Sequence, residues 1–235
     1  MSPSVVVLAG EPEYDSQESM RPIADLLASR LDLEVDYRTP SVLADEPDFP
    51  VSSFGDLSVL ADAALLIVYT RFRRLPDAEM QALADYLRGT GAVLGLRTSS
   101  HAFHFGPESS WSSWNVTFGR DVLGSPWISH HGHSSSTEVE VLNDVPEALV
   151  EGLPDRFRVR SWLYRTELAD WCRPILVGSP VDPESEPTPG PVAWYGIPQG
   201  RRTFYTSLGH VEDLQLAAVQ TLLLNGARWS LGEDR

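Results

Sequence analysis

The sequence predicts an α/β fold with a mostly parallel sheet and helices on both faces. Three apolar runs, at residues 5–9, 63–69 and 92–96, have the length and composition of buried strands. Amphipathic helical patterns lie between them. Strands that alternate with helices of this length indicate right-handed βαβ units, and such units build a parallel sheet.

The first helix is predicted between the first run and a more exposed strand at residues 33–37. Pro22 suits its first turn, and Ile23, Leu26, Leu27 and Leu31 recur at helical spacing. A loop rich in Asp, Pro and Ser is expected from there to about residue 58.

A second helix follows the run at residues 63–69. Pro76 stands at its start and Gly89 is placed to end it. Its apolar stripe consists of Met80, Leu83, Ala84 and Leu87. The strand at residues 92–96 comes next.

The second half of the chain is less regular. Residues 99–135 read as a long loop that holds five of the six histidines, and a strand is expected at residues 137–142. Residues 191–210 read as a hairpin with its tip near Pro198–Gly200. Asp213 is predicted to cap a final helix that runs through Trp229. No repeat or domain boundary is evident, so residues 1–235 are expected to form one domain.

Composition excludes several classes of partner. The chain has a net charge of −15, which opposes binding to nucleic acid or to anionic membrane surfaces. A single cysteine, Cys172, excludes an internal disulfide, and neither a transmembrane run nor a signal peptide is recognised. A cytoplasmic protein is the expectation, and a homo-oligomer is compatible with the sequence.

Polar side chains follow the predicted strands. Ligands of open α/β sheets bind beyond the carboxyl ends of the strands, so these residues are expected to share one edge. They are Glu11, Glu13, Tyr14, Arg71, Arg97, His101 and His210.

The stretch GLRTS (residues 95–99) invites comparison with a nucleophile elbow. Its nucleophile position holds Arg97, whose guanidinium stays protonated and cannot attack a substrate. Ser99 and Ser100 lie near His101, but adjacency in sequence does not make a catalytic triad. The sequence therefore disfavours nucleophilic catalysis here.

The histidines allow two interpretations. His130, His131 and His133 form the dense motif HHGH, and imidazole commonly binds Zn, Mn or Fe. His101 and His210 could add ligands to such a divalent metal. The alternative, which the weakness of the motif favours, is that these histidines hold loops in place or orient a polar ligand.

The remaining candidates concern ligand binding and proton transfer. Arg71 and Arg97 could bind an anionic or hydroxyl group, or fix a nearby carboxylate. Glu11 and Glu13 could form a general acid/base pair. Trp127, with Trp111 and Trp114, could form an aromatic platform for a sugar, although packing is the commoner role of tryptophan.

Several segments, taken in order, resemble the ThuA-like (trehalose-utilisation) family. They include GEPEY, RTSSHAF, SHHGH, SWLYRTEL and FYTSLGH, and the likeness covers nearly the whole chain. It is strongest to a branch frequent in planctomycete-type bacteria, whose motifs His101, His131 and His210 match best.

The resemblance implies a flavodoxin-like fold, similar to that of class I glutamine amidotransferases, and a link to sugar metabolism. It also shows departures. Typical members place a histidine where this chain has Arg97, and the amidotransferase cysteine is absent, so glutaminase activity is not expected.

Three hypotheses of function remain. In the first, the protein is an enzyme acting on a carbohydrate or oxidised sugar derivative, with Glu11 or Glu13 as acid/base, His101 and His210 in proton transfer, and Arg71, Arg97, Tyr14, Trp127 and His131 as ligand contacts. The second is a non-catalytic domain that binds or senses a small molecule. The third is a structural subunit whose histidines only fix loops.

Overall fold

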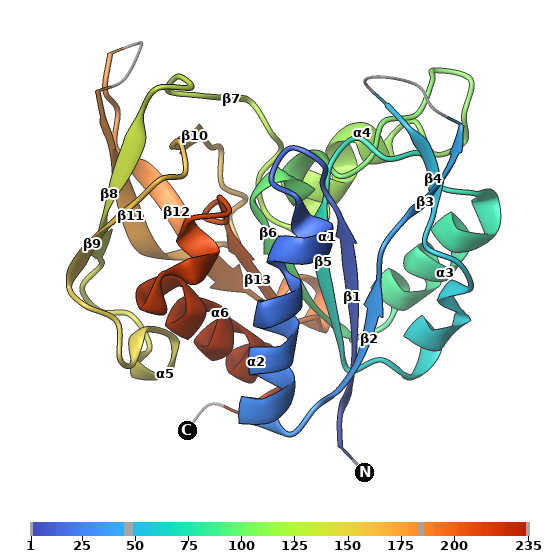
Figure 1. The fold of residues 1–235 in the computed structure, drawn as a ribbon, viewed down its shortest axis with the longest axis horizontal. Helices are drawn as coiled ribbons and strands as arrows, with labels where there is room; N and C mark the ends of the chain where they lie inside the picture. The colour runs from blue at the N-terminus through green and yellow to red at the C-terminus, as the bar shows by residue number, and fades with distance from the viewer. Residues whose placement is uncertain (1, 45–48, 183–185, 234–235) are drawn as a thin grey trace.

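A single nine-stranded sheet runs through the molecule, in the order β2-β1-β5-β6-β13-β12-β11-β8-β9 (Figure 1). The structure is a computed structural model that describes residues 2–44, 49–182 and 186–233. None of the helices in these ranges is both long and apolar enough to span a membrane.

The first five strands of the sheet are parallel: β2 (Glu34–Arg38), β1 (Ser4–Gly10), β5 (Leu65–Thr70), β6 (Ala92–Leu96) and β13 (Thr203–Thr206). The other four extend the sheet in antiparallel fashion: β12 (Gly190–Gly196), β11 (Arg173–Val181), β8 (Ser136–Val141) and β9 (Arg156–Val159). The predicted α/β architecture is confirmed, with an antiparallel half that the sequence showed only in part.

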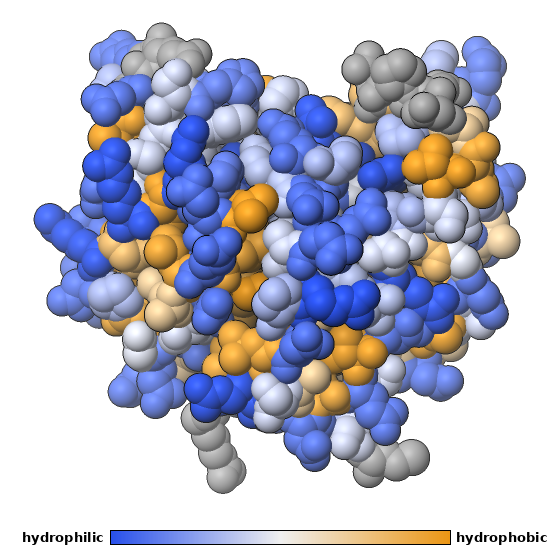
Figure 2. Space-filling view, viewed as in Figure 1, coloured by the Kyte–Doolittle hydropathy of each residue, from blue (hydrophilic) through white to orange (hydrophobic). Residues whose placement is uncertain are grey.

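Alternate side chains of β1 enter two different hydrophobic cores, which explains its unbroken apolar sequence. Val5 and Val7 belong to the core under α2 (Arg21–Leu31) and α6 (Ala217–Ser230). Val6 and Leu8 belong to the core on the other face, under α3 (Asp77–Arg88). Because both faces are covered by helices, period-two alternation is absent from the strand. Figure 1 shows α2 and α6 side by side in front of the sheet. Figure 2 shows the same face, on which hydrophilic residues predominate and hydrophobic residues form smaller patches.

The predicted loop before residue 58 contains regular structure. A short hairpin joins β3 (Ser41–Ala44) to β4 (Val51–Ser53), and the 3-10 helix η1 (Leu57–Asp62) follows. The connection at residues 45–48 lies outside the described residues. Glu79 holds this region to α3, because its carboxylate accepts hydrogen bonds from Phe54 N at 2.8 Å and from the Ser53 hydroxyl.

Short helical turns fill the stretch after β6. They are η2 (Arg97–His101), α4 (Trp114–Thr117) and the π-helical turn η3 (Phe118–Val122). A two-stranded pair, β7 (Ser129–His130) with β10 (Tyr164–Arg165), crosses the same end of the molecule. A last short helix, α5 (Glu147–Val150), contacts α6; α1 (Ser16–Ser19) precedes α2. The 3-10 turn η4 (Pro198–Gly200) joins β12 to β13, so the predicted hairpin is confirmed.

Gly119 allows η3 to approach η2, the turn that carries His101. A Cβ atom at position 119 would lie 2.2 Å from the Ser100 carbonyl oxygen and 3.0 Å from that of Ser125. Both are backbone atoms, so neither can rotate away.

We therefore expect Gly119→Ala to lower the free energy of unfolding by about 1–3 kcal/mol, the usual cost of overpacking. Urea unfolding monitored by circular dichroism measures this change. Gly106→Ala is the matched control, because a Cβ there meets nothing within 4 Å. Equal stability of the two variants would contradict the proposed close approach.

Candidate functional site

A small cleft lies at the carboxyl ends of the parallel strands, where the sequence predicts a site. Its volume is about 60 Å³. Segments that follow β1, β5 and β6 meet there with residues 127–133 and 162–164. The lining residues are Glu13, Tyr14, Arg71, Thr98, His101, Trp127, His130, His133, Trp162 and Tyr164.

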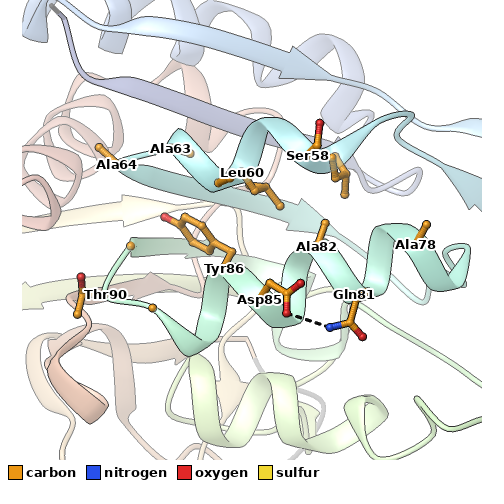
Figure 3. Close-up of a pocket in the computed structure, with 14 residues that line it drawn as sticks. Ser58, Leu60, Ala63, Ala64, Ala78, Gln81, Ala82, Asp85, Tyr86 and Thr90 are labelled. Carbon is orange, nitrogen blue, oxygen red and sulfur yellow. Dashed lines mark hydrogen bonds between the residues drawn. The ribbon is translucent and has the colours of Figure 1, made fainter.

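A larger cavity, of about 800 Å³, lies between η1 and α3 (Figure 3). Small apolar side chains such as Ala63, Ala78 and Ala82 form much of its lining. Asp85 is the one carboxylate among the lining residues, and it accepts a hydrogen bond from Gln81 at 2.9 Å. Volume alone therefore does not identify the site, and the chemistry favours the smaller cleft.

Arg97 lies beneath the cleft. Its backbone has a φ of 42°, so the turn after β6 keeps a strained geometry although an arginine stands in the nucleophile position. The side chain is fully buried. Its guanidinium donates to the Ser207 carbonyl and to the Tyr14 hydroxyl, both at 2.9 Å, and contacts the rings of Tyr14, Trp162 and Tyr164. Arg97 does not line the cleft, so the structure places this predicted ligand contact in a supporting position.

The two predicted acid/base residues have different environments. Glu11 is fully buried, and its Oε2 accepts a hydrogen bond from Tyr14 N at 2.5 Å, while Oε1 has no partner in the part of the chain that the structure describes. Burial raises the pKa of the Glu11 carboxyl to about 7, despite opposing hydrogen bonds from backbone N–H groups. Glu13 lines the cleft and pairs with Arg71, whose Nε lies 3.5 Å from Glu13 Oε2.

His101 is buried in the wall of the cleft. Its Nδ1 lies 3.2 Å from the Ser100 hydroxyl, and its ring packs against Phe72 and Trp127. Burial, together with the charges of Arg71 and Arg97, lowers the pKa of the His101 imidazole to about 3. The ring is therefore neutral near pH 7 and can donate or accept a hydrogen bond without carrying charge.

The histidines of the HHGH motif do not act as a group. His130 and His133 line the cleft, with ring centroids 4.5 Å apart, and both pack against Trp162. His131 is buried, and its Nδ1 lies 3.5 Å from Arg165 Nη2. Within the described ranges, no group of three or more His, Cys, Asp or Glu side chains is placed to hold a metal ion.

The prediction that Asp213 caps the final helix is wrong. Helix α6 begins at Ala217, and no side chain caps it. The buried carboxylate of Asp213 instead accepts hydrogen bonds from the backbone N–H groups of Arg160, Ser161, Gly209 and His210 and from the Ser161 hydroxyl. It thereby joins the segment before Trp162 to the segment after β13.

The hydrogen bond from His210 N to the Asp213 carboxylate helps to fix the position of His210. Its ring meets that of Tyr14 edge-on, with centroids 5.5 Å apart, and its Nδ1 accepts a hydrogen bond from Glu212 N at 3.2 Å. Burial lowers the pKa of His210. The residue stands beside the cleft and is not part of its lining.

Sequence reasoning missed Trp162 and Tyr164 as site residues. Neither follows a strand of the parallel sheet, so the strand-end rule does not reach them. Both contact Arg97 and both line the cleft. Tyr164 lies on β10, a two-residue strand too short to leave a periodic pattern.

Glu11 should give a pH-dependent stability that a neutral side chain removes. A pKa of about 7 in the folded state lies above the ordinary value of 4.5, so its stabilisation is present below pH 4.5 and is lost as the pH rises to 7. Relative to wild type, Glu11→Gln should therefore gain about 3 kcal/mol in unfolding free energy between pH 4.5 and pH 8.

Urea titrations at both pH values measure this difference between variant and wild type. Glu13→Gln is the control, because Glu13 is more exposed and pairs with Arg71. A Glu11→Gln difference that stays constant with pH would show that folding does not raise the pKa of this carboxyl.

Comparison with solved structures places the fold among known proteins. A ThuA-like protein from Parabacteroides merdae is similar over 98% of this chain and 90% of its own, with a TM-score of 0.66 and 18% identity. A cytoplasmic protein from Salmonella typhimurium matches 97% of this chain and 99% of its own, with a TM-score of 0.59 and 12% identity. Agd3, a carbohydrate deacetylase, matches 98% of this chain over 32% of its own, with a TM-score of 0.54 and 12% identity.

No curated protein sequence matches the chain. At these identities the structural matches establish the fold alone. The family model of ThuA, described as trehalose utilisation, matches residues 5–230. That range contains every residue assigned above to the cleft and to its support. The chain belongs to the ThuA family.

Proposed function

We propose that the cleft binds a carbohydrate or an oxidised sugar derivative and that the protein serves sugar utilisation without glutaminase activity. The observation that carries this proposal is the lining of the cleft. Trp127, Trp162 and Tyr164 provide apolar ring surfaces, while Arg71 and Glu13 provide polar groups beside them. Sugars combine apolar faces with hydroxyl groups, so this mixture of side chains suits them.

Five buried polar atoms without hydrogen-bond partners among the described residues belong to residues that line the cleft or adjoin its lining, and they support the proposal. They are Glu11 Oε1, Thr70 Oγ1, Arg97 Nε, Thr98 Oγ1 and Trp162 Nε1. Buried polar groups are normally hydrogen-bonded, so a concentration of unpaired ones calls for a polar partner. Of these residues, Thr98 and Trp162 line the cleft, so hydroxyl or carbonyl groups of a sugar there could pair with Thr98 Oγ1 and Trp162 Nε1.

The cleft must widen before it can hold a sugar. Its 60 Å³ corresponds to about two water molecules, too little for a whole sugar ring. Trp127 is 41% exposed and packs on His101. Movement of Trp127 away from His101 would widen the cleft, so we assign it the role of an adjustable wall.

The protein does not offer the nucleophile that glutamine hydrolysis requires. Arg97 occupies the position at which an elbow presents a nucleophile. Cys172 is buried elsewhere, 3.6 Å from the Gly124 carbonyl oxygen, and burial raises the pKa of its thiol to about 12. A thiol with this pKa is almost entirely protonated at neutral pH and is a poor nucleophile.

Within the enzyme hypothesis, Glu11 is the acid/base whose pKa suits neutral pH. Glu13 and Arg71 would hold ligand hydroxyl groups at the entrance, and neutral His101 would donate or accept a hydrogen bond. His210 would act from beside the cleft through Tyr14.

The second candidate is a non-catalytic domain that binds or senses the same class of ligand. One observation favours it: Glu11 is buried and does not line the cleft, so proton transfer from its carboxyl would need an intermediary group. The similarity to part of a carbohydrate deacetylase is compatible with either candidate, since the matched region is 32% of that protein.

Calorimetric titration with mono- and disaccharides and their keto derivatives tests binding. For a sugar that binds, Trp127→Ala should weaken affinity about tenfold, equivalent to about 1.4 kcal/mol, because the ring surface is lost. Trp111→Ala is the control, since Trp111 lies away from the cleft and donates to Asp77. Absence of binding by every sugar, or an equal loss in both variants, would contradict the proposal.

A further inference from the structure

A separate cavity of about 270 Å³ lies between α3, the segment formed by α4 and η3, and the turn before β13. It shares no lining residue with the cleft described above. Its lining consists of Ala84, Leu87, Arg88, Trp114, Thr117, Phe118, Asp121, Val122, Gln199 and Arg201. The volume is close to the lower end of the range typical of small-molecule sites.

Arg201 brings a buried positive charge to this cavity. The residue is only 3% exposed, and among the described residues its guanidinium makes one hydrogen bond, from Nη1 to the Leu87 carbonyl. Nε is buried without a partner. No carboxylate pairs with Arg201 among the described residues. A buried charge with so little compensation is costly unless an anion pairs with it.

The edge of the guanidinium formed by Nε and Nη2 is the one that suits a carboxylate. Two other arginines show this geometry within the protein. Arg38 donates hydrogen bonds from Nε and Nη2 to the Asp36 carboxylate at 2.5 and 2.7 Å. Arg120 donates to the Asp121 carboxylate from the same two atoms at 2.6 and 2.9 Å. The same edge of Arg201 forms no hydrogen bond with the described residues, and a carboxylate would satisfy both donors at once.

The walls of the cavity suit an apolar ligand body. The rings of Trp114 and Phe118 are nearly parallel, at 14°, with centroids 6.0 Å apart. Leu87 and Val122 add aliphatic surface. Phe118 and Val122 lie at the two ends of a π-helical turn, an irregularity often found at functional sites.

We propose that this cavity binds a small carboxylate with an aromatic or branched apolar body. The carboxylate would pair with the Nε–Nη2 edge of Arg201, and the apolar body would lie against Trp114 and Phe118. Because Nε is covered in this structure, binding includes a small rotation of the guanidinium toward the cavity. The proposal is independent of the sugar cleft.

A purely structural role for Arg201 makes a different prediction. The hydrogen bond to Leu87 places a cation at the carboxyl end of α3, where it interacts favourably with the helix dipole. That role uses Nη1 and involves no ligand. A substitution would then change stability without changing the binding of any small anion.

Benzoate, benzamide and benzylamine are suitable probes, because they share a ring and differ in charge. We expect benzoate to bind at least tenfold more tightly than benzamide, and benzylamine to bind least. Two-dimensional NMR titrations of the full chain measure the affinities, and the shift changes should centre on Trp114, Phe118 and Arg201.

Arg201→Gln should weaken benzoate binding at least tenfold, whereas Arg202→Gln should leave it unchanged. Arg202 is the matched control because it lies outside the cavity and donates to the Trp229 carbonyl. Should Arg201→Gln fail to fold, Thr117→Phe, which fills the cavity and keeps the guanidinium, should also abolish binding.

Three results of these titrations would overturn the proposal, and a complete absence of binding would be a fourth. They are equal affinity for benzoate and benzamide, unchanged benzoate binding in a folded Arg201→Gln or Thr117→Phe variant, and shift changes confined to the sugar cleft. Absence of benzoate binding at millimolar concentration would likewise leave Arg201 with the helix-capping role alone.

Discussion

The buried guanidinium of Arg97 is the interaction around which the site is organised. A cation removed from water needs several partners, and this one finds them on segments far apart in the chain. Tyr14 follows β1, Tyr164 lies on β10, and Ser207 follows β13; all three contact the guanidinium directly. Displacement of any of these segments would leave the charge less compensated. The shape of the cleft floor therefore depends on a charge that does not itself line the cleft.

Asp213 is a second buried charge, of opposite sign to Arg97, and it binds the neighbouring segments. Arg97 offers donors to carbonyl and hydroxyl oxygens, while the Asp213 carboxylate accepts from N–H and O–H groups of Ser161 and His210. Trp162 follows Ser161 directly and contacts Arg97, so it is held between the two charges. Neither charge relies on a partner of opposite sign among the described side chains. Backbone N–H groups supply most of the hydrogen bonds to Asp213, whereas Arg97 combines a backbone carbonyl with the Tyr14 hydroxyl and aromatic rings. The positions of these loops are therefore part of the electrostatic balance.

The parts of the fold that local pattern determines could be predicted from the sequence. The apolar runs of β1, β5 and β6 reflect burial on both faces, and parallel pairing then places Glu11, Arg71 and His101 at one edge. Contacts between distant segments leave no such signal. Asp213 has the spacing of a helix cap, yet its carboxylate satisfies donors about fifty residues away. The Asp213 carboxylate makes tertiary hydrogen bonds in place of a local helix cap.

The net charge of the protein and its buried arginines act on an approaching anion at different distances. A net charge of −15 repels anions in solution and slows their approach, especially at low ionic strength. Arg97 and Arg201 are both buried, so their charges are screened less by salt than surface charges are, and they act mainly at short range. An anion that reaches the Arg201 guanidinium meets local donors whose strength the acidic surface elsewhere changes little. Added salt should therefore speed the association of a carboxylate with Arg201 more than it weakens the bound state, the opposite of the behaviour of an anion site on a basic surface.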